Sequence, residues 1–183
     1  MRKLIVYEYV TLDGVMEAPE KWQFPFLNDE VAEVIQSQIM DADAILLGRV
    51  TYDIFAASWP TRTNNEFGVA DKLNSMPKFV VSSTLDRADW NHSTLIRGNV
   101  VEEINKLKQQ PEGTIAIIGS ARLIQSLVEY DLVDEYQLMV HPVVLGSGKR
   151  LFPEGINLDL RLANANAFSS GVVLLRYQAD KNN

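Results

Sequence analysis

The sequence contains no cysteine and only two histidines, His92 and His141, among its 183 residues. The missing thiols exclude disulfide bonds, thiolate nucleophiles and cysteine-based zinc sites. Neither histidine has other metal ligands at a typical spacing, so we predict no metal site. No stretch approaches the roughly 20 consecutive apolar residues that a membrane-spanning helix needs, and we expect no membrane partner.

Basic residues are also in short supply, since 17 Lys and Arg stand against 24 Asp and Glu, for a formal net charge of −7. Phosphate backbones repel a protein of this sign, so we expect no nucleic-acid partner. Apolar residues make up 46% of the chain, which excludes disorder as a description of the whole. Without repeats or linkers, we predict one domain over residues 1–178 and a polar tail over 179–183.

The N-terminal segment is basic and then apolar, as in a secretory signal peptide. Its apolar run is interrupted by Glu8 and again by Asp13-Gly14, which makes it too short for the hydrophobic region of such a signal. We interpret it as a buried strand and expect the protein in the cytoplasm.

The hydrophobic pattern alternates between short buried strands and amphipathic helices as far as residue 129, and then becomes extended. The predicted strands are 3–11, 44–47, 78–81, 94–96, 114–118, 133–144, 158–168 and 172–177; the predicted helices are 29–40, 50–57, 66–75, 100–108 and 121–129. This pattern predicts an α/β three-layer sandwich, with a mainly parallel central sheet, helices on both faces and antiparallel C-terminal strands.

Three predicted strands end in similar turns, which are Gly48-Arg49, Ser82-Ser83 and Gly119-Ser120. Ligands of open α/β sheets bind beyond the carboxyl ends of the strands, and helix N-termini there offer free N–H groups to phosphate. A single turn of this kind is explained by the need to end a strand. Three together favour a nucleotide site, although none has the G-x-G-x-x-G spacing of the Rossmann fingerprint.

Two acidic residues near the long connection after the first strand are candidates for proton transfer. Glu30 lies at the border of the apolar stripe of the predicted helix 29–40, and Asp13 lies in a Leu-Asp-Gly turn. Both also have ordinary structural explanations, because acidic residues are favoured in the first turn of a helix and Asp-Gly pairs form turns. The residues alone leave both explanations open.

Six short motifs follow one another along the chain: Val10–Gly14, Leu47–Tyr52, Val81–Thr84, Ile118–Leu123, Pro142–Phe152 and Ser169–Leu175. Each is weak alone. In this order and spacing, from about Lys3 to Tyr177, the chain resembles the dihydrofolate reductase superfamily. The branch that it resembles most is related to the C-terminal reductase domain of the bifunctional riboflavin-biosynthesis deaminase/reductase.

The resemblance implies a reductase that uses NADPH and, as in related domains, forms a homodimer. The positions that it implies for the cofactor are Val10 and residues 12–14 beside the nicotinamide; Gly48, Arg49 and Thr51 on the phosphate and ribose side; Ser82 and Ser83, with Arg49, around the 2′-phosphate; and Gly119, Ser120, Ala121, Arg122 and Leu123 around the pyrophosphate. An arginine among hydroxyl donors suits a 2′-phosphate.

The chain departs from the family pattern at two points. Many relatives carry Gly-Gly where this chain has Gly119-Ser120, and the acidic residue at the start of the first helix of dihydrofolate reductase has only approximate counterparts in Asp29 and Glu30. The expected reaction is hydride transfer to a small heterocyclic or sugar-derived molecule, such as the riboflavin-pathway compound 5-amino-6-(5-phosphoribosylamino)uracil. The open alternatives are a true dihydrofolate reductase, an NADPH-binding sensor or interaction protein without turnover, and a fold that binds no ligand.

Overall fold

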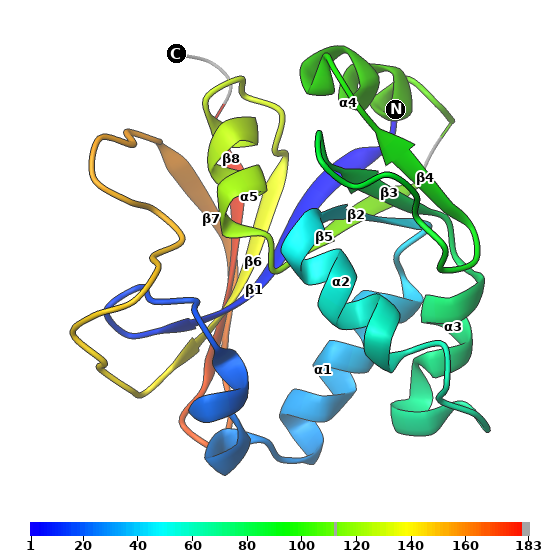
Figure 1. The fold of residues 1–183 in the computed structure, drawn as a ribbon. Coiled ribbons are helices and arrows are strands. Elements are labelled where there is room, and N and C mark those ends of the chain that lie inside the picture. Colours follow the sequence, from blue (N-terminus) through cyan, green and yellow to red (C-terminus); the bar gives the residue numbers. More distant parts are fainter. Residues whose placement is uncertain (112, 181–183) are drawn as a thin grey trace.

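The computed structural model describes residues 1–111 and 113–180, which form a single sheet with helices on both of its faces (Figure 1). Within these residues the strand order is β4-β3-β2-β5-β1-β6-β8-β7. The strands are β1 (Lys3–Thr11), β2 (Ala44–Gly48), β3 (Lys78–Val81), β4 (Ser93–Ile96), β5 (Thr114–Ile118), β6 (Glu135–His141), β7 (Leu160–Ala167) and β8 (Val173–Ala179). The helices are α1 (Asp29–Met40), α2 (Arg49–Ser58), α3 (Ala70–Ser75), α4 (Val100–Lys108) and α5 (Ala121–Val128), with short 3-10 turns η1 (Pro19–Lys21), η2 (Phe24–Phe26) and η3 (Glu66–Gly68).

Strand direction divides the sheet into two parts. From β4 to β6 every neighbouring pair is parallel, with β1 between β5 and β6 and β2 between β3 and β5. The last two strands reverse this direction, because β8 runs antiparallel to both β6 and β7. The mainly parallel sheet with antiparallel C-terminal strands is therefore confirmed.

The alternation of side chains along the central strands creates two separate cores. On β1, Leu4 and Val6 point to one face and Ile5 and Tyr7 to the other, as the period of two in a strand requires. Helices α4 and α5 cover the first face, and α1, α2 and α3 cover the second. The two helical layers and the sheet between them form the predicted three-layer sandwich.

A local signal places the start of α1. Asn28 caps α1, since its side-chain oxygen accepts a hydrogen bond from the backbone N–H of Val31 at 3.0 Å. The continuous helix predicted over 66–75 is wrong, because Phe67 and Gly68 adopt left-handed backbone conformations, with φ of 58° and 70°, that divide it into η3 and α3.

The C-terminal strand β8 extends further than expected. The backbone N–H of Ala179 donates to the carbonyl oxygen of Asp134 at 3.1 Å, so the strand runs into the stretch predicted as a polar tail. Asp180 follows the strand, and residues 181–183 of the predicted tail lie outside the described residues.

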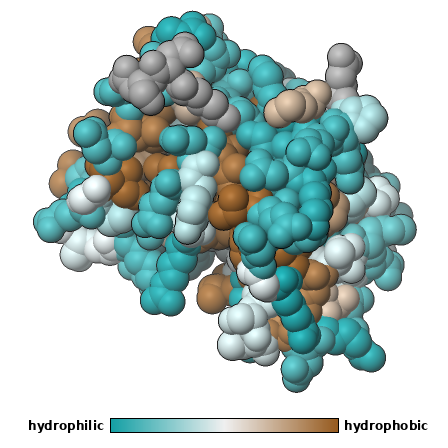
Figure 2. Space-filling view, turned by 90° about the horizontal axis from the view of Figure 1, so that it is seen from above, coloured by the Kyte–Doolittle hydropathy of each residue, from teal (hydrophilic) through white to brown (hydrophobic). Residues whose placement is uncertain are grey.

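The surface is mixed in character. Seen from above, hydrophilic residues cover most of the molecule and hydrophobic residues appear between them in patches (Figure 2). Two apolar side chains of α2, Val50 and Ile54, lie one helical turn apart and are 73% and 62% exposed. In the described ranges, no helix is both long enough and apolar enough to cross a bilayer.

Candidate functional site

The three turns singled out in the sequence lie side by side at one edge of the sheet. Because β3, β2 and β5 are parallel neighbours, their carboxyl ends share that edge. The register pairs Gly48 at the end of β2 with Val81 at the end of β3, and Leu46 with Ile117 on β5. The residues that follow these strands therefore converge at the place where α/β sheets bind ligands.

Ser120 connects the two turns that open into α2 and α5. Its hydroxyl oxygen accepts a hydrogen bond from the backbone N–H of Gly48 at 2.9 Å and donates to the hydroxyl of Thr51 at 3.0 Å. Both Gly119 and Ser120 have positive φ, 61° and 67°. A Cβ on Gly119 would lie 2.9 Å from the Thr51 hydroxyl oxygen, so glycine is needed there. The side chain of Ser120 holds the two turns together.

Arg49 reaches from the start of α2 towards the turn that follows β3. Its guanidinium donates to the hydroxyl of Thr84 at 2.5 Å and pairs with Asp53 at 3.5 Å, while 48% of its side chain stays exposed. Ser82 is buried, and its hydroxyl oxygen accepts from the backbone N–H groups of Thr84 and Leu85. The exposed side chains of Arg49 and Ser83 therefore remain able to meet an anion at this edge.

Helix α5 begins at the same edge, immediately after Ser120. Its first residues, Ala121 and Arg122, are partly or fully exposed, and a helix N-terminus carries backbone N–H groups without partners inside the helix. Leu123 is instead buried in the core beneath α5. The arrangement has the donors that a pyrophosphate needs, although Leu123 serves mainly in packing.

Asp13 forms the link between two loops at the end of β1. Its carboxylate accepts from the Thr11 hydroxyl at 2.6 Å and from the backbone N–H groups of Gly146 at 2.8 Å and Leu145 at 3.3 Å. The hydrogen bond from Thr11 is the largest cause of a pKa lowered to about 2. An acid with that pKa is ionised near neutral pH and is a poor proton donor.

Glu30 is held in a comparable way at the start of α1. Its carboxylate accepts from the hydroxyl and the backbone N–H of Ser169, in the turn between β7 and β8, and from the side-chain amide of Asn28. The bond from the Ser169 hydroxyl is the largest cause of its lowered pKa. These bonds favour the ionised form, so near neutral pH Glu30 carries no proton that it could donate to a substrate.

The environment of Glu8 is a feature that the sequence reasoning missed. Its side chain is only 7% exposed, on the face of β1 that also carries Val6 and Val10. Burial is the largest cause of a pKa raised well above its usual value. A signal was available, because Glu8 interrupts an apolar series of period two at Leu4, Val6 and Val10, but we interpreted it only as the end of an apolar run.

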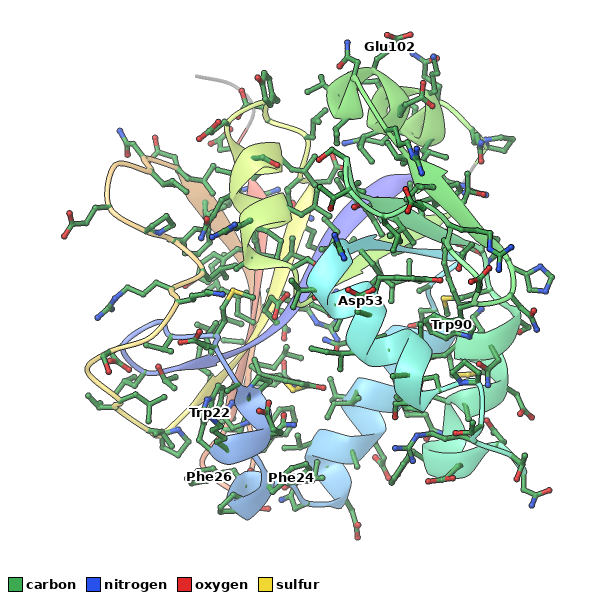
Figure 3. All side chains as sticks on the ribbon, viewed as in Figure 1. Trp22, Phe24, Phe26, Asp53, Trp90 and Glu102 are labelled. Atoms are coloured by element: carbon green, nitrogen blue, oxygen red, sulfur yellow. The ribbon has the colours of Figure 1, made fainter. Side chains whose placement is uncertain are left out.

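Aromatic side chains cover the face of the sheet opposite to the one that carries Glu8, near the end of β6. The ring of Trp22 lies edge-on to that of His141, with centroids 5.1 Å apart, and Tyr9 and Phe26 approach the same imidazole. Figure 3 shows Trp22, Phe24 and Phe26 grouped beside α1. His141 is 2% exposed and burial lowers its pKa, so the neutral imidazole serves in packing.

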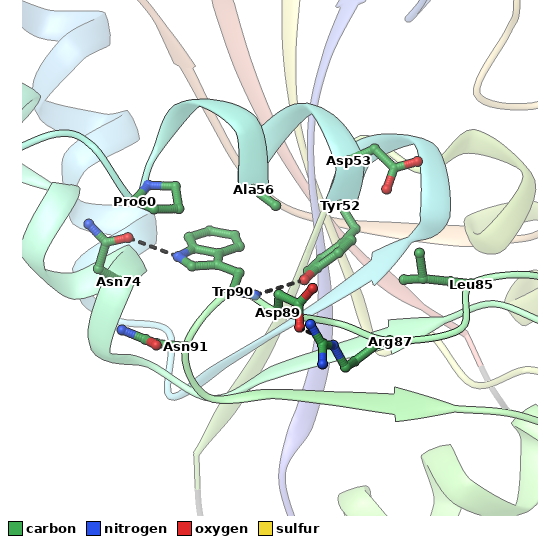
Figure 4. Close-up of a pocket in the computed structure, with 10 residues that line it drawn as sticks. All are labelled: Tyr52, Asp53, Ala56, Pro60, Asn74, Leu85, Arg87, Asp89, Trp90 and Asn91. Carbon is green, nitrogen blue, oxygen red and sulfur yellow. Dashed lines mark hydrogen bonds and ion pairs between the residues drawn. The ribbon is translucent and has the colours of Figure 1, made fainter.

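A cavity of about 500 Å³ lies next to this edge, between α2 and the segment that joins β3 to β4, and its lining includes Asp53, the ion-pair partner of Arg49 (Figure 4). Trp90 forms part of its wall; the indole donates to the side chain of Asn74 at 2.9 Å, and the backbone N–H of Trp90 donates to the Tyr52 hydroxyl at 3.0 Å. Of the residues predicted to bind a cofactor, none lines it. In the part of the chain that the structure describes, no group of three or more potential metal ligands occurs.

Comparisons with known proteins agree with this architecture. The family model of the RibD C-terminal domain matches residues 2–174. Two relatives from Bacillus subtilis (strain 168) are similar over almost their whole length: uncharacterized protein YyaP is 36% identical, covering 96% of this chain and 94% of its own, and uncharacterized protein YwjB is 31% identical, covering 94% and 96%.

Solved structures share the fold at low sequence identity. A protein of Shewanella sp. PV-4, named for riboflavin biosynthesis, has a TM-score of 0.75 at 21% identity and covers 98% of this chain and 99% of its own. Dihydrofolate reductase from Enterococcus faecalis, complexed with NADP(H), has a TM-score of 0.65 at 15% identity and covers 98% and 97%. The fold expected from the sequence is thereby confirmed.

Proposed function

Because the chain belongs to the RibD C-terminal domain family, we propose that it is a reductase that binds NADPH across the edge formed by β3, β2 and β5. The observation that carries this proposal is the convergence of Arg49, Ser83 and the N-terminus of α5 at adjacent strand ends. Together they offer a guanidinium, a hydroxyl and free N–H groups within one region of a chain whose net charge is negative.

The residues at this edge fit a dinucleotide phosphate. Gly119, where a Cβ would meet Thr51, lets the turn after β5 pack closely against the start of α2. Arg49 and Ser83 suit the 2′-phosphate that distinguishes NADPH from NADH, and the start of α5 with Arg122 suits the pyrophosphate. The enterococcal dihydrofolate reductase, whose structure contains NADP(H), supports this proposal through its shared fold.

The substrate that we propose is small and carries a polarised C=N or C=O bond. NADPH supplies the hydride when it is bound, and the chain binds, orients and shields the reacting groups from water. The riboflavin-pathway intermediate 5-amino-6-(5-phosphoribosylamino)uracil has this character. We also propose that the protein is cytoplasmic and that it forms a homodimer.

The test is a comparison of NADPH with NADH by thermal shift and calorimetry. We expect NADPH at about 100 times its dissociation constant to stabilise the protein by about 2.7 kcal/mol, and NADH at the same concentration to do less. Arg49→Ala should lose this preference. Arg161→Ala, on the edge strand β7 at the far side of the sheet, is the matched control and should keep it. Equal responses of the wild type to both nucleotides would remove the phosphate assignment.

A second candidate function is a protein that binds NADPH without turnover. It is favoured by the hydrogen bonds that hold Asp13 and Glu30 in their ionised forms, since neither then supplies the proton that reduction of C=N or C=O requires. Oxidation of NADPH by dihydrofolate or by any of a panel of reducible pyrimidines would decide in favour of the enzyme. Tight binding without consumption would favour the second candidate.

A further inference from the structure

Strands β1 and β5 separate beyond a short parallel pairing. The two strands are paired as far as Tyr7 and Ile118, and Glu8 is the first residue of β1 beyond that pairing. The helix that follows β5, α5, covers one face of the sheet, and the helix that follows β1, α1, packs on the other. Such a change of direction opens a crevice between the two strand ends, and open α/β sheets bind ligands there.

The carboxyl group of Glu8 is buried in apolar surroundings. The face of β1 that carries it belongs to an apolar core that includes Ile117, Leu123 and Leu138. The backbone N–H of Gly119 interacts with the carboxyl group and partly opposes the effect of burial on its pKa, and no charged side chain contributes to the shift. The charges of Glu135 and Arg176 act instead on Tyr7, which points to the opposite face.

One oxygen atom of the same carboxyl group lacks a hydrogen bond. Within the described residues, the Oε1 atom of Glu8 is buried and has no hydrogen-bond partner. A buried polar atom without a partner is costly, and a protonated carboxyl has an O–H that must find an acceptor. With Gly119 beside one part of the carboxyl group, the O–H remains available to a molecule that enters the crevice.

We propose that Glu8 stands protonated at the base of this crevice and donates its O–H to a carbonyl oxygen of the bound ligand. The inference rests on the proposed function: with NADPH bound, the acceptor is the carboxamide oxygen of the nicotinamide, because Val10 on the same face of β1 is the residue predicted to lie beside that ring. Glu8 is then a cofactor-binding residue that fixes the orientation of the nicotinamide for hydride transfer.

The experiment measures the equilibrium binding of NADPH and of its thionicotinamide analogue, in which sulfur, a weak acceptor, replaces the carboxamide oxygen. The variants are Glu8→Gln, which keeps a neutral donor, and Glu8→Leu, which fills similar space without one. We expect the wild type and Glu8→Gln to bind NADPH with similar affinity and to prefer it over the analogue. Glu8→Leu should bind NADPH about tenfold more weakly and show no preference, in line with the loss of one buried hydrogen bond.

Gln137→Leu is the matched control, because Gln137 is also a buried polar residue but bonds to Gln38 and Glu135 on the other face of the sheet. Its nucleotide affinities should match those of the wild type. If Glu8→Leu retained both the affinity and the preference of the wild type, the inference would be overturned and Glu8 would be a structural residue.

An infrared measurement on the free protein separates this inference from the proposed function. A protonated carboxyl gives a C=O stretching band, which we expect in the wild type and expect to disappear in Glu8→Gln. Absence of that band overturns the inference whether or not NADPH binds. Failure of the wild type to bind NADPH, with the band present, overturns the proposed function and with it the assignment of the nicotinamide as the acceptor.

Discussion

The carboxyl groups at the rim of the candidate site and the one at its base have opposite surroundings. Asp13 lies in a loop and Glu30 in the first turn of α1, and each accepts several hydrogen bonds, so the pKa of each is lowered. Glu8 lies in the core with a partnerless oxygen, and burial raises its pKa. The difference teaches that an acidic residue can lie close to a predicted site and still carry no proton to donate in catalysis. Desolvation and hydrogen bonding decide which carboxyl keeps its proton.

The largest effect that would test this contrast is the pH dependence of stability at Glu8. Because its pKa is raised in the folded state, the wild type binds an additional proton on folding and loses stability as pH rises from the unfolded pKa to the folded one. Glu8→Gln does not titrate. We expect the free energy of unfolding of the variant, relative to that of the wild type, to rise by about 1.4 kcal/mol per pH unit across that window. Urea unfolding from pH 4 upwards measures the difference, and parallel curves for the two proteins would contradict a raised pKa.

An effect of intermediate size is expected at the rim, where the turns are closely packed. Gly119→Ala places a Cβ 2.9 Å from the Thr51 hydroxyl oxygen at a φ of 61°, and should cost about 1–3 kcal/mol of stability and weaken NADPH binding. Gly155→Ala has a similar positive φ of 89° but open space around it, so it reports backbone strain alone. Equal losses of stability in the two variants would show that the close approach at Gly119 contributes nothing.

The smallest effect is expected at Asp13, because its carboxylate is exposed. Its pKa is lowered to about 2, so its contribution to stability is present near neutral pH and is lost as pH falls from about 4 towards 2. Asp13→Asn should remove this dependence, which has the opposite sign to that of Glu8. Acid unfolding of the wild type and the variant measures it, and a difference in stability between the two proteins that stayed constant from pH 4 to pH 2 would be inconsistent with the hydrogen bonds from Thr11 and Gly146.

Local patterns were sufficient for most of the fold. The period of two in β1 and the Asn28 cap of α1 lie within a few residues of the elements that they specify, so they can be recognised in the sequence. The parallel direction of the strands was predicted from their alternation with helices, and parallel neighbours bring Arg49, Ser82 and Gly119 to one edge. The division of the predicted helix 66–75 was missed, because the left-handed conformation of Phe67 is unusual for a side chain of its size.

The partners of the titratable groups could not be inferred in the same way. Asp13 meets Gly146, and Glu30 meets Ser169, across more than 130 positions of the chain. Glu8 is buried by side chains from β5, β6 and α5, all of them distant in sequence. Hydropathy and spacing describe a residue's own segment, so they carry no information about the dielectric surroundings that the other segments create.

By itself, the sequence determined the strands, most helices and the edge at which three donor-bearing turns gather, because backbone propensities and side-chain periodicity act over short distances. Only the tertiary structure decided which carboxyl is charged and which is neutral. Protonation depends on water, hydrogen-bond donors and apolar neighbours that meet around a side chain after the whole chain has folded.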